Sequence, residues 1–488
     1  MNREFFFNIG LLVLINLLIK PFYIFGIDRT VQNLVPEGDY GLYFALFNFS
    51  FLFYMISDFG IQYFNSHHLA QHRHLLQKYL PAFLSLKFLL SIGYLIVVFI
   101  IGILSGYDSR HFPLLLLLTF VQLLNSLVLF LRSNLSGIGR YRTDSLVSAL
   151  DRLLLIFICG ALLWTPSWRS QFQIAWFAWA QISSLSMTAI IVFVIIRRHA
   201  GPLTFRFRPA LLRLIIRYST PFALAVFLMT AYTRMDGIML ERLLPDGQIE
   251  SDYYASAFRL LDAGNMIGFL FAGLLLPMFS SLAQKSVPLL SLLRFSFQLI
   301  WAFAIPLAIG TIFYRQEIMV LLYENGGKYS GDILGLLMLT FIAMSTGYIF
   351  STLLTALGKL RKMNYIFLGG FLINLALNLL LIPQYKATGA AFATCLTQFG
   401  IVLAHLVLMR QELTLPTNYS LLIRISIYVA IIFAFNLILA NWQNSNWGVK
   451  YILGLVLSLF PAFGLQLIDL KALLRFLSPG HKEIHKDI

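Results

Sequence analysis

The sequence predicts an all-α polytopic membrane protein with about fourteen transmembrane helices, arranged as two pseudo-symmetric six-helix lobes plus two extra C-terminal helices. Three observations lead to this prediction: the apolar stretches, the distribution of charge and an internal duplication. Hydrophobic residues make up 59% of the chain, charged residues 12%, and the mean hydropathy is +0.79. The hydrocarbon core of a bilayer is about 30 Å thick, so a spanning helix needs roughly 20 apolar residues. Such stretches lie at about 6–26, 40–62, 79–104, 112–133, 144–164, 173–196, 217–240, 254–282, 288–314, 333–356, 362–383, 387–409, 419–440 and 449–470.

The first apolar stretch is predicted to be a membrane helix and not a cleaved signal peptide. It carries Lys20-Pro21 near its end and has no small-residue cleavage motif. The two cysteines, Cys159 and Cys395, both fall inside predicted spans. The sequence therefore indicates neither a disulfide framework nor a cysteine metal site.

The net charge of +15 is distributed unevenly along the chain. The segment 197–217 alone carries six arginines, whereas loops on the opposite side of the predicted spans are acidic, as at Glu241, Asp246, Glu250 and Asp252. This asymmetry is typical of a multi-pass protein with both termini in the cytoplasm, and it argues against nucleic-acid binding. We therefore expect a multi-pass membrane protein whose basic loops contact anionic lipid headgroups. Six of the seven tryptophans fall where the outer interface is expected: Trp164, Trp168, Trp176, Trp179, Trp442 and Trp447.

Two sequence repeats indicate the duplication. Leu135–Arg142 recurs as Leu354–Arg361, and Leu34–Tyr40 recurs as 243–253 with a short insertion. Each repeat is shifted by six predicted helices, and an even shift gives both halves the same orientation in the membrane. We expect an N-terminal lobe at 1–210, a C-terminal lobe at 211–412, and helices thirteen and fourteen with a cytoplasmic tail at 413–488. Gly139 and Gly358, at matching positions within the two copies of the first repeat, are interpreted as helix C-caps.

Charged side chains inside the predicted spans are the candidates for function, because each costs about 2.5–3.5 kcal/mol on insertion scales. Arg259 and Asp262 lie three residues apart on one helical face and can neutralise each other. Asp58 and Lys87, on successive helices, can pair as well. Asp151 with Arg152, and Arg234 with Asp236, point about 100° and 200° apart around a helix, so their pairing is less expected. The nine charges are Lys20, Lys87, Arg152, Arg234, Arg259, Asp58, Asp151, Asp236 and Asp262.

Lys20 is the charge that these pairings leave unexplained. It lies beside Pro21 with no acidic residue nearby in sequence, so one interpretation is that it extends toward the outer headgroups. The other is that it faces a central path and binds a phosphate-bearing substrate, together with Arg234 from the second lobe at a similar depth. The candidate substrate-binding charges are Lys20, Arg234, Asp236, Arg259, Asp58 and Lys87.

We find no pattern in the sequence that predicts an enzyme, a cofactor or a metal site. There is no Walker loop and no nucleophile elbow. The histidines at positions 67, 68, 72 and 74 lie in a predicted loop without supporting Asp, Glu or Cys, so a solvated loop is the favoured interpretation.

Several short motifs in a fixed order make a family resemblance visible. They are Pro36-Glu37-Gly38, Asp58-Phe59-Gly60, Arg234-Met235-Asp236 leading to Leu243-Leu244-Pro245, and Tyr254–Leu261 followed by Leu-Leu-Pro at 275–277. Over about 1–410 the chain resembles the polysaccharide-biosynthesis flippases of the multidrug/oligosaccharidyl-lipid/polysaccharide exporter (MOP) superfamily. The resemblance implies a two-lobed transporter with a cationic central cavity, in which Asp58 belongs to the second-helix motif and Arg234 and Asp236 to the seventh-helix motif.

The resemblance also implies a function. Such proteins lie in the bacterial plasma (inner) membrane. They translocate undecaprenyl-diphosphate-linked oligosaccharides from the inner to the outer leaflet by alternating access, for O-antigen, capsule or exopolysaccharide synthesis. The expected partners are the lipid-linked oligosaccharide, membrane lipids, a coupling ion (H⁺ or Na⁺) and a polysaccharide polymerase. Three alternatives stay open: a lipid II flippase, a cation-coupled multidrug exporter of the same superfamily, and a polytopic glycan polymerase or glycosyltransferase.

Overall fold

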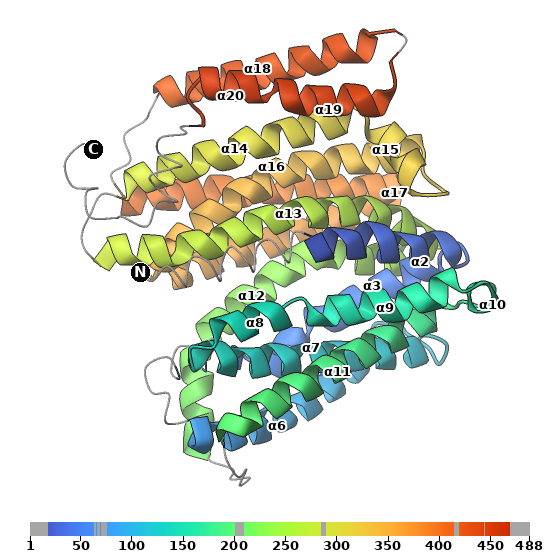
Figure 1. The fold of residues 1–488 in the computed structure, drawn as a ribbon, viewed down its shortest axis with the longest axis vertical. Coiled ribbons are helices and arrows are strands. Elements are labelled where there is room, and N and C mark those ends of the chain that lie inside the picture. The colour runs from blue at the N-terminus through green and yellow to red at the C-terminus, as the bar shows by residue number, and fades with distance from the viewer. Residues whose placement is uncertain are drawn as a thin grey trace. The chain divides into compact units, whose positions relative to one another are not determined.

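The computed structural model describes residues 18–62, 65, 69, 76–200, 209–284, 289–413, 419–443 and 445–468. Within these ranges every regular element is a helix (Figure 1), and eleven helices are long and apolar enough to cross a membrane. The predicted all-α polytopic membrane fold is confirmed. The histidines of the 67–74 loop lie outside the described residues.

The chain divides into two compact units. The first contains residues 1–256 and 360–393, and the second contains 257–359 and 394–488. The first unit therefore combines the whole predicted N-terminal lobe with 211–256 and 360–393 from the predicted C-terminal lobe. The lobe boundaries at 210 and 412 stay a prediction.

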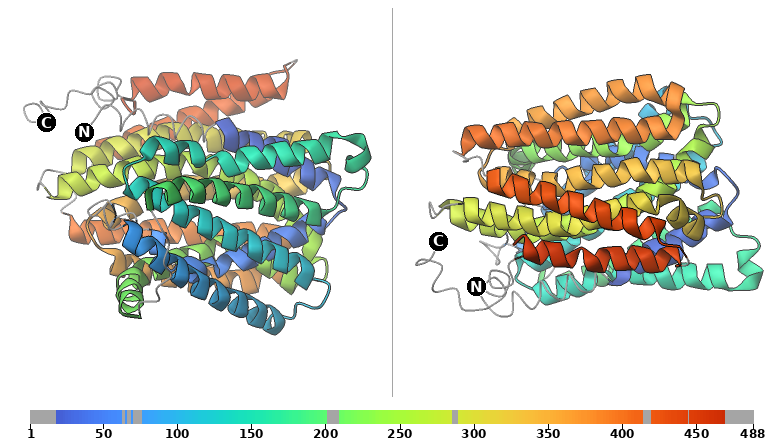
Figure 2. Two further views of the ribbon diagram at one scale, coloured as in Figure 1. Left: turned by 60° about the horizontal axis from the view of Figure 1, so that its bottom comes forward. Right: turned by 90° about the horizontal axis from the view of Figure 1, so that it is seen from above.

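The first unit contains three long helices that pack against one another, α6, α7 and α11 (Figures 1 and 2). The cluster at their contact contains Phe83 of α6, Phe130 and Leu131 of α7, and Val192 of α11, all nearly inaccessible to solvent. Its elements, in addition to the first part of α13 and the first part of α17, are η1 (Tyr23–Asp28), α2 (Arg29–Leu34), α3 (Asp39–Leu52), α4 (Tyr54–Asp58), α6 (Leu76–Leu104), α7 (Phe112–Gly137), α8 (Tyr141–Val147), α9 (Leu150–Trp164), α10 (Pro166–Arg169), α11 (Ile174–Ala200) and α12 (Pro209–Leu243).

The second unit packs its last helices against α14. The Tyr428 hydroxyl of α18 donates to the Ala302 carbonyl of α14 at 2.9 Å, and Trp301 of α14 donates to Thr346 of α16 at 2.8 Å. The elements are α13 (Gly247–Gln284, shared with the first unit), α14 (Leu290–Phe313), α15 (Arg315–Leu322), α16 (Lys328–Ala356), α17 (Leu360–Glu412, shared), α18 (Tyr419–Asn441), α19 (Trp447–Leu457) and α20 (Leu459–Gly464).

Three predicted spans are each divided into two helices in the structure. The span at 40–62 is α3 and α4, which meet at Phe53, the span at 144–164 is α8 and α9, and the span at 449–470 is α19 and α20. The spans at 362–383 and 387–409 are assigned to one element, α17, whose backbone leaves the helical region at Lys386 (φ 53°), between the two predicted spans. Apolar length predicts a span but does not report a local break within it.

The first repeat has the same local structure in both copies. Gly139 and Gly358 adopt φ of 85° and 70°, a region that glycine enters without a steric penalty. The next residue then donates a backbone hydrogen bond back to the helix, Arg140 to Leu135 and Lys359 to Leu354, each at 2.9 Å. This pattern is a Schellman C-cap, so the predicted capping role of both glycines is confirmed.

Candidate functional site

Lys87 and Asp58 form a buried ion pair in the first unit. Lys87 Nζ on α6 lies 2.7 Å from Asp58 Oδ1 at the end of α4, with the two side chains 5% and 1% exposed. The ammonium also donates to the Ser57 carbonyl at 3.2 Å and to the Ser126 hydroxyl on α7. An ammonium has three N–H donors, so this set uses all of them. The predicted pairing of Asp58 with Lys87 is confirmed.

Lys20 lies in a different environment, close to two arginines. Lys20 interacts electrostatically with three charged side chains: Arg152, Asp151 and Arg132. Arg152 pairs with Asp151 (Nε to Oδ2, 3.5 Å), and Arg132 pairs with Asp144 (Nε to Oδ1, 2.8 Å). Among the described residues, no carboxylate lies within ion-pair distance of Lys20 itself. The group thus contains three cations, and each of the two arginines forms an ion pair with one carboxylate. We call Lys20, Arg132 and Arg152 the cationic cluster.

The cationic cluster joins three helices that are distant in sequence. Lys20 belongs to the first helix, just before the π-helical turn η1, Arg132 belongs to α7 and Arg152 to α9. Arg152 also lies over the Tyr23 ring, with its Cζ 4.7 Å from the ring centroid. The pairing of Asp151 with Arg152, which their directions around a helix make less expected, is present, because the arginine side chain is long enough to reach its neighbour.

Asp236 on α12 is the third buried centre. Its carboxylate accepts hydrogen bonds from the Tyr254 hydroxyl at 2.5 Å and from Asn378 Nδ2 at 2.8 Å. Asn378 also donates to Asn374 Oδ1 at 3.1 Å, one helical turn earlier on α17. The asparagines were absent from the predicted site because they carry no charge, although a four-residue spacing of amides in an apolar span is a visible signal.

The last two predicted site residues have separate surroundings. Arg234, two residues before Asp236 on α12, lies over the Phe51 ring of α3 with Cζ 5.9 Å from the centroid. Arg259 lies on the part of α13 that belongs to the second unit, three residues before Asp262. The structure therefore joins Asp58 with Lys87, and surrounds Lys20 with arginines that the site prediction did not include.

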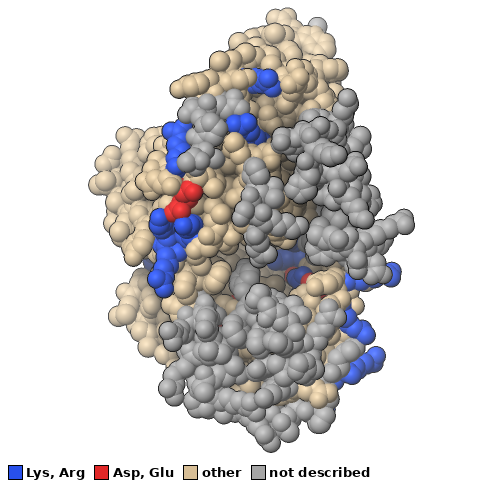
Figure 3. Space-filling view, turned by 90° about the vertical axis from the view of Figure 1, so that its left-hand side faces the viewer, with Lys and Arg blue, Asp and Glu red and all other residues tan. Residues whose placement is uncertain are grey.

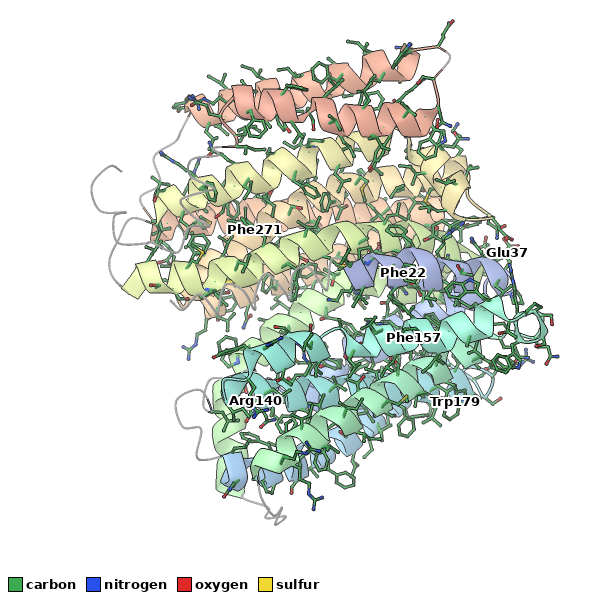
Figure 4. The ribbon with its side chains drawn as sticks, viewed as in Figure 1. Phe22, Glu37, Arg140, Phe157, Trp179 and Phe271 are labelled. Carbon is green, nitrogen blue, oxygen red and sulfur yellow. The ribbon has the colours of Figure 1, made fainter. Side chains whose placement is uncertain are left out.

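The two ends of the first unit differ in charge. Figure 4 labels Arg140 at one end and Glu37 and Trp179 at the other. On the face shown in Figure 3, at the Arg140 end, the charged residues that are drawn are mostly Lys and Arg (blue), with few Asp and Glu (red). We call the opposite end, which carries Glu37, Asp39, Glu241, Asp246, Glu250 and Asp252, the acidic end.

At the acidic end, residues on either side of the first copy of the second repeat (Leu34–Tyr40) contact its second copy (243–253). Gln32 Nε2 donates to Asp252 Oδ1 at 2.6 Å, and the Ser251 hydroxyl donates to the Gly41 carbonyl at 3.1 Å. A Cβ on Gly41 would lie 1.9 Å from the Gln248 carbonyl oxygen, so this approach requires glycine. The contact brings the start of α3 against the start of α13.

Ion pairs reinforce the acidic end. Lys386, at the break in α17, contacts Asp246 at 2.5 Å and Glu250 at 3.3 Å, and its hydrogen bond lowers the pKa of Asp246. Arg242 donates to the Gly106 carbonyl at 3.1 Å and lies over the Tyr107 ring. Burial, with the adjacent Glu241 charge, raises the pKa of the Tyr107 phenol, so it remains a hydrogen-bond donor to Glu241.

Comparison with known proteins identifies the family. The family model for polysaccharide biosynthesis proteins matches residues 7–283, more than half of the chain. The chain belongs to this family. An uncharacterized membrane protein of Methanocaldococcus jannaschii, MJ1375, is 26% identical over 190 residues, which is 39% of this chain and 44% of that protein. The match thus spans less than half of that relative.

Solved structures with the same fold include transporters of the MOP superfamily. The lipid II flippase MurJ, in an inward closed conformation, aligns with a TM-score of 0.72 and 16% identity over 95% of this chain and 100% of MurJ. An inward-facing multidrug resistance MATE transporter aligns with a TM-score of 0.60 and 12% identity, over 80% of this chain and 94% of its own. A MOP superfamily transporter from Pyrococcus furiosus aligns with a TM-score of 0.59 and 14% identity, over 83% of this chain and 95% of its own. This family member is a multi-pass membrane protein with the MOP transporter fold.

Proposed function

We propose that this polysaccharide biosynthesis protein is a flippase for undecaprenyl-diphosphate-linked oligosaccharides, moving them from the inner to the outer leaflet for O-antigen, capsule or exopolysaccharide synthesis. The observation that carries the proposal is the cationic cluster. Three cations within a membrane-embedded unit repel one another, and an anion that binds among them relieves this repulsion. A diphosphate supplies that charge together with several acceptor oxygens.

Lys20 is the primary ligand in this proposal. Its ammonium has donors to offer, since no described carboxylate pairs with it, whereas Arg132 and Arg152 already hold Asp144 and Asp151. The arginines add positive potential and can turn toward the diphosphate. Arg234, half-buried on α12, is a second cation for the same headgroup. Asp58 and Lys87 support the helices around this site rather than bind the substrate.

Alternating access requires the acidic end to open. In the proposal the lobes 1–210 and 211–412 rock against each other, and helices thirteen and fourteen stay outside this pair. The contacts of Gln32 with Asp252 and of Gly41 with Ser251 join these predicted lobes, so they must break when the headgroup is released outside. The flipped glycan then becomes the substrate of a polysaccharide polymerase.

A cross-link across the acidic end tests this motion. The chain has two native free thiols, Cys159 and Cys395, so a cysteine-free background restricts the reaction to the introduced pair. Gln32→Cys with Asp252→Cys, joined by a short bismaleimide, should abolish transport, and cleavage of the linker should restore it. Asp108→Cys with His111→Cys, within one loop, is the matched control and should have no effect when joined. Full transport with the first pair cross-linked would contradict the opening of this end.

The Asp236 centre is the proposed site for a coupling ion, H⁺ or Na⁺. Carboxylate and amide oxygens are ligands for hard cations, and Asn378 Oδ1 is buried without a hydrogen bond among the described residues. Asp236→Asn should remove the dependence of transport on the ion gradient while the lipid-linked glycan still binds. A gradient dependence unchanged by this substitution would exclude Asp236 from coupling.

The decisive test of function is where the glycan lipid accumulates. With Lys20→Gln and Arg234→Gln combined, lipid-linked glycan should collect on the cytoplasmic face while the protein still inserts at its normal level. Normal surface glycan in the double variant would contradict the site. Resistance to cationic drugs that depends on this protein would instead indicate an exporter.

A lipid II flippase is the second candidate, favoured by the alignment that covers all of MurJ and 95% of this chain. Lipid II also carries a diphosphate, so the cationic cluster serves either substrate. Expression of this protein in cells depleted of their lipid II flippase separates the two. Restored growth indicates lipid II, whereas restored surface polysaccharide in cells lacking their own oligosaccharide flippase supports the leading proposal.

A further inference from the structure

A tryptophan-lined pocket lies on the first unit, where α9, α10 and α11 meet. It has a volume of about 370 Å³, within the range of small-ligand pockets. Its lining residues come from the end of α9, from α10 and from the first turns of α11: Ile158, Leu162, Trp168, Trp176, Trp179, Ala180 and Ser183. None of these residues belongs to the cationic cluster, the Asp58–Lys87 pair or the Asp236 centre.

The shape of the pocket fits a slender apolar chain. It follows α11 from Trp176 to Ser183, seven residues, which is about 10 Å at about 1.5 Å per residue. One leaflet of the hydrocarbon core is about 15 Å thick, half of about 30 Å, so the pocket extends over about two thirds of that length. A partner helix is about 10–12 Å across with its side chains. It would need a groove that extends over several helical turns, and the seven lining residues of this pocket do not form one.

A positive charge lies next to the pocket in the sequence. Trp168 and Trp179, which line the pocket, are about half exposed, and the exposed Arg169 follows Trp168 at the end of α10. The connection 165–173 contains no acidic residue, unlike the acidic loops at the same end of the unit. Indole rings favour the headgroup level of a membrane, and a guanidinium binds phosphate oxygens in bidentate fashion.

We propose that this pocket binds one acyl chain of an anionic glycerophospholipid, with the lipid phosphate held by Arg169. The apolar wall takes the chain, the tryptophans lie at the level of the ester groups, and the charge of the neighbouring Arg169 selects an anionic headgroup. The bound lipid is a fixed component of the first unit, distinct from the lipids that exchange freely around it.

Native mass spectrometry of the full-length protein, delipidated in detergent and titrated with phosphatidylglycerol, tests this site. We expect one saturable lipid per chain. Arg169→Gln should weaken its binding by about 10- to 100-fold, the range for a hydrogen bond to a charged group. The matched control is Arg110→Gln, an exposed arginine on another loop at the same end, which should bind as the parent protein does.

Two further comparisons keep the result interpretable. Trp179→Ala removes part of the wall and should weaken binding, whereas Trp442→Ala, at a similarly exposed tryptophan just after α18, should not. Diacylglycerol, which lacks the phosphate, should bind the parent protein as weakly as phosphatidylglycerol binds Arg169→Gln. Binding that never saturates, or that is equal in all four variants, would overturn the proposal. Displacement of phosphatidylglycerol by undecaprenyl phosphate at equal concentration would overturn it in favour of the substrate's tail.

Discussion

Lys87 and Lys20 are both lysines inside the membrane-embedded part of the first unit, yet their surroundings differ. Lys87 is buried against Asp58, Ser57 and Ser126, which use all its donors. Lys20 is half-buried, and two of the three charges that act on it are also positive. A buried cation therefore does not by itself indicate a substrate site. What distinguishes a binding site is positive charge that the protein leaves uncompensated.

The largest expected effect of a single substitution is on the compensated lysine. Asp58→Ala leaves the Lys87 ammonium buried without its carboxylate, and loss of one partner of a buried pair costs about 3–5 kcal/mol. We expect a sharp fall in membrane protein level and in thermal stability in detergent. Asp58→Asn combined with Lys87→Met removes both charges and should recover most of that stability. If the double variant is as unstable as Asp58→Ala, the pair has a role beyond mutual neutralisation.

Ser126→Ala should have a smaller effect at the same centre. The substitution removes one acceptor from the Lys87 ammonium and leaves Asp58 and the Ser57 carbonyl in place, so we expect a loss of about 1–3 kcal/mol. Thermal unfolding in detergent measures it, and Ser91→Ala, on the same helix as Lys87, is the control. An unchanged melting temperature would mean that the Ser126 bond does not contribute to the network.

The smallest effect on stability should be at Lys20. Its replacement by glutamine relieves repulsion within the cationic cluster and breaks no ion pair among the described residues, so the expected change is within about 0.5 kcal/mol. The same melting experiment measures it. A loss comparable to that of Asp58→Ala would show that Lys20 is a structural cation like Lys87.

The sequence was sufficient to predict the membrane fold and the surroundings of Lys87, but not those of Lys20. Asp58 and Lys87 fall on successive apolar stretches, and their opposite charges predict the pair that the structure contains. The cationic cluster needs three helices that are distant in sequence, and no pattern at Lys20, Arg132 or Arg152 reports their proximity. The sequence therefore predicts which charges are costly and leaves their partners to be found in the fold.

The same limit applies to the acidic end and to Asp236. The repeat at Leu34–Tyr40 and 243–253 is visible in the sequence, but that residues on either side of its first copy contact its second copy follows only from the packing of α3 against α12 and α13. The hydrogen bonds of Asp236 come from the neutral residues Tyr254 and Asn378. Charge counting does not find such partners, because a neutral donor in an apolar helix resembles any other polar residue.

The measurement that tests the central claim most directly compares two proteins in one flipping assay, by the amount of lipid-linked glycan that reaches the outer leaflet at equal protein level. One carries Lys20→Gln, and the other carries Asp58→Asn with Lys87→Met. The account predicts that Lys20→Gln lowers transport about 10- to 100-fold, as expected for loss of a charged hydrogen bond, while the double variant keeps most of its activity. Normal transport by Lys20→Gln together with loss of transport in the stable double variant would contradict it.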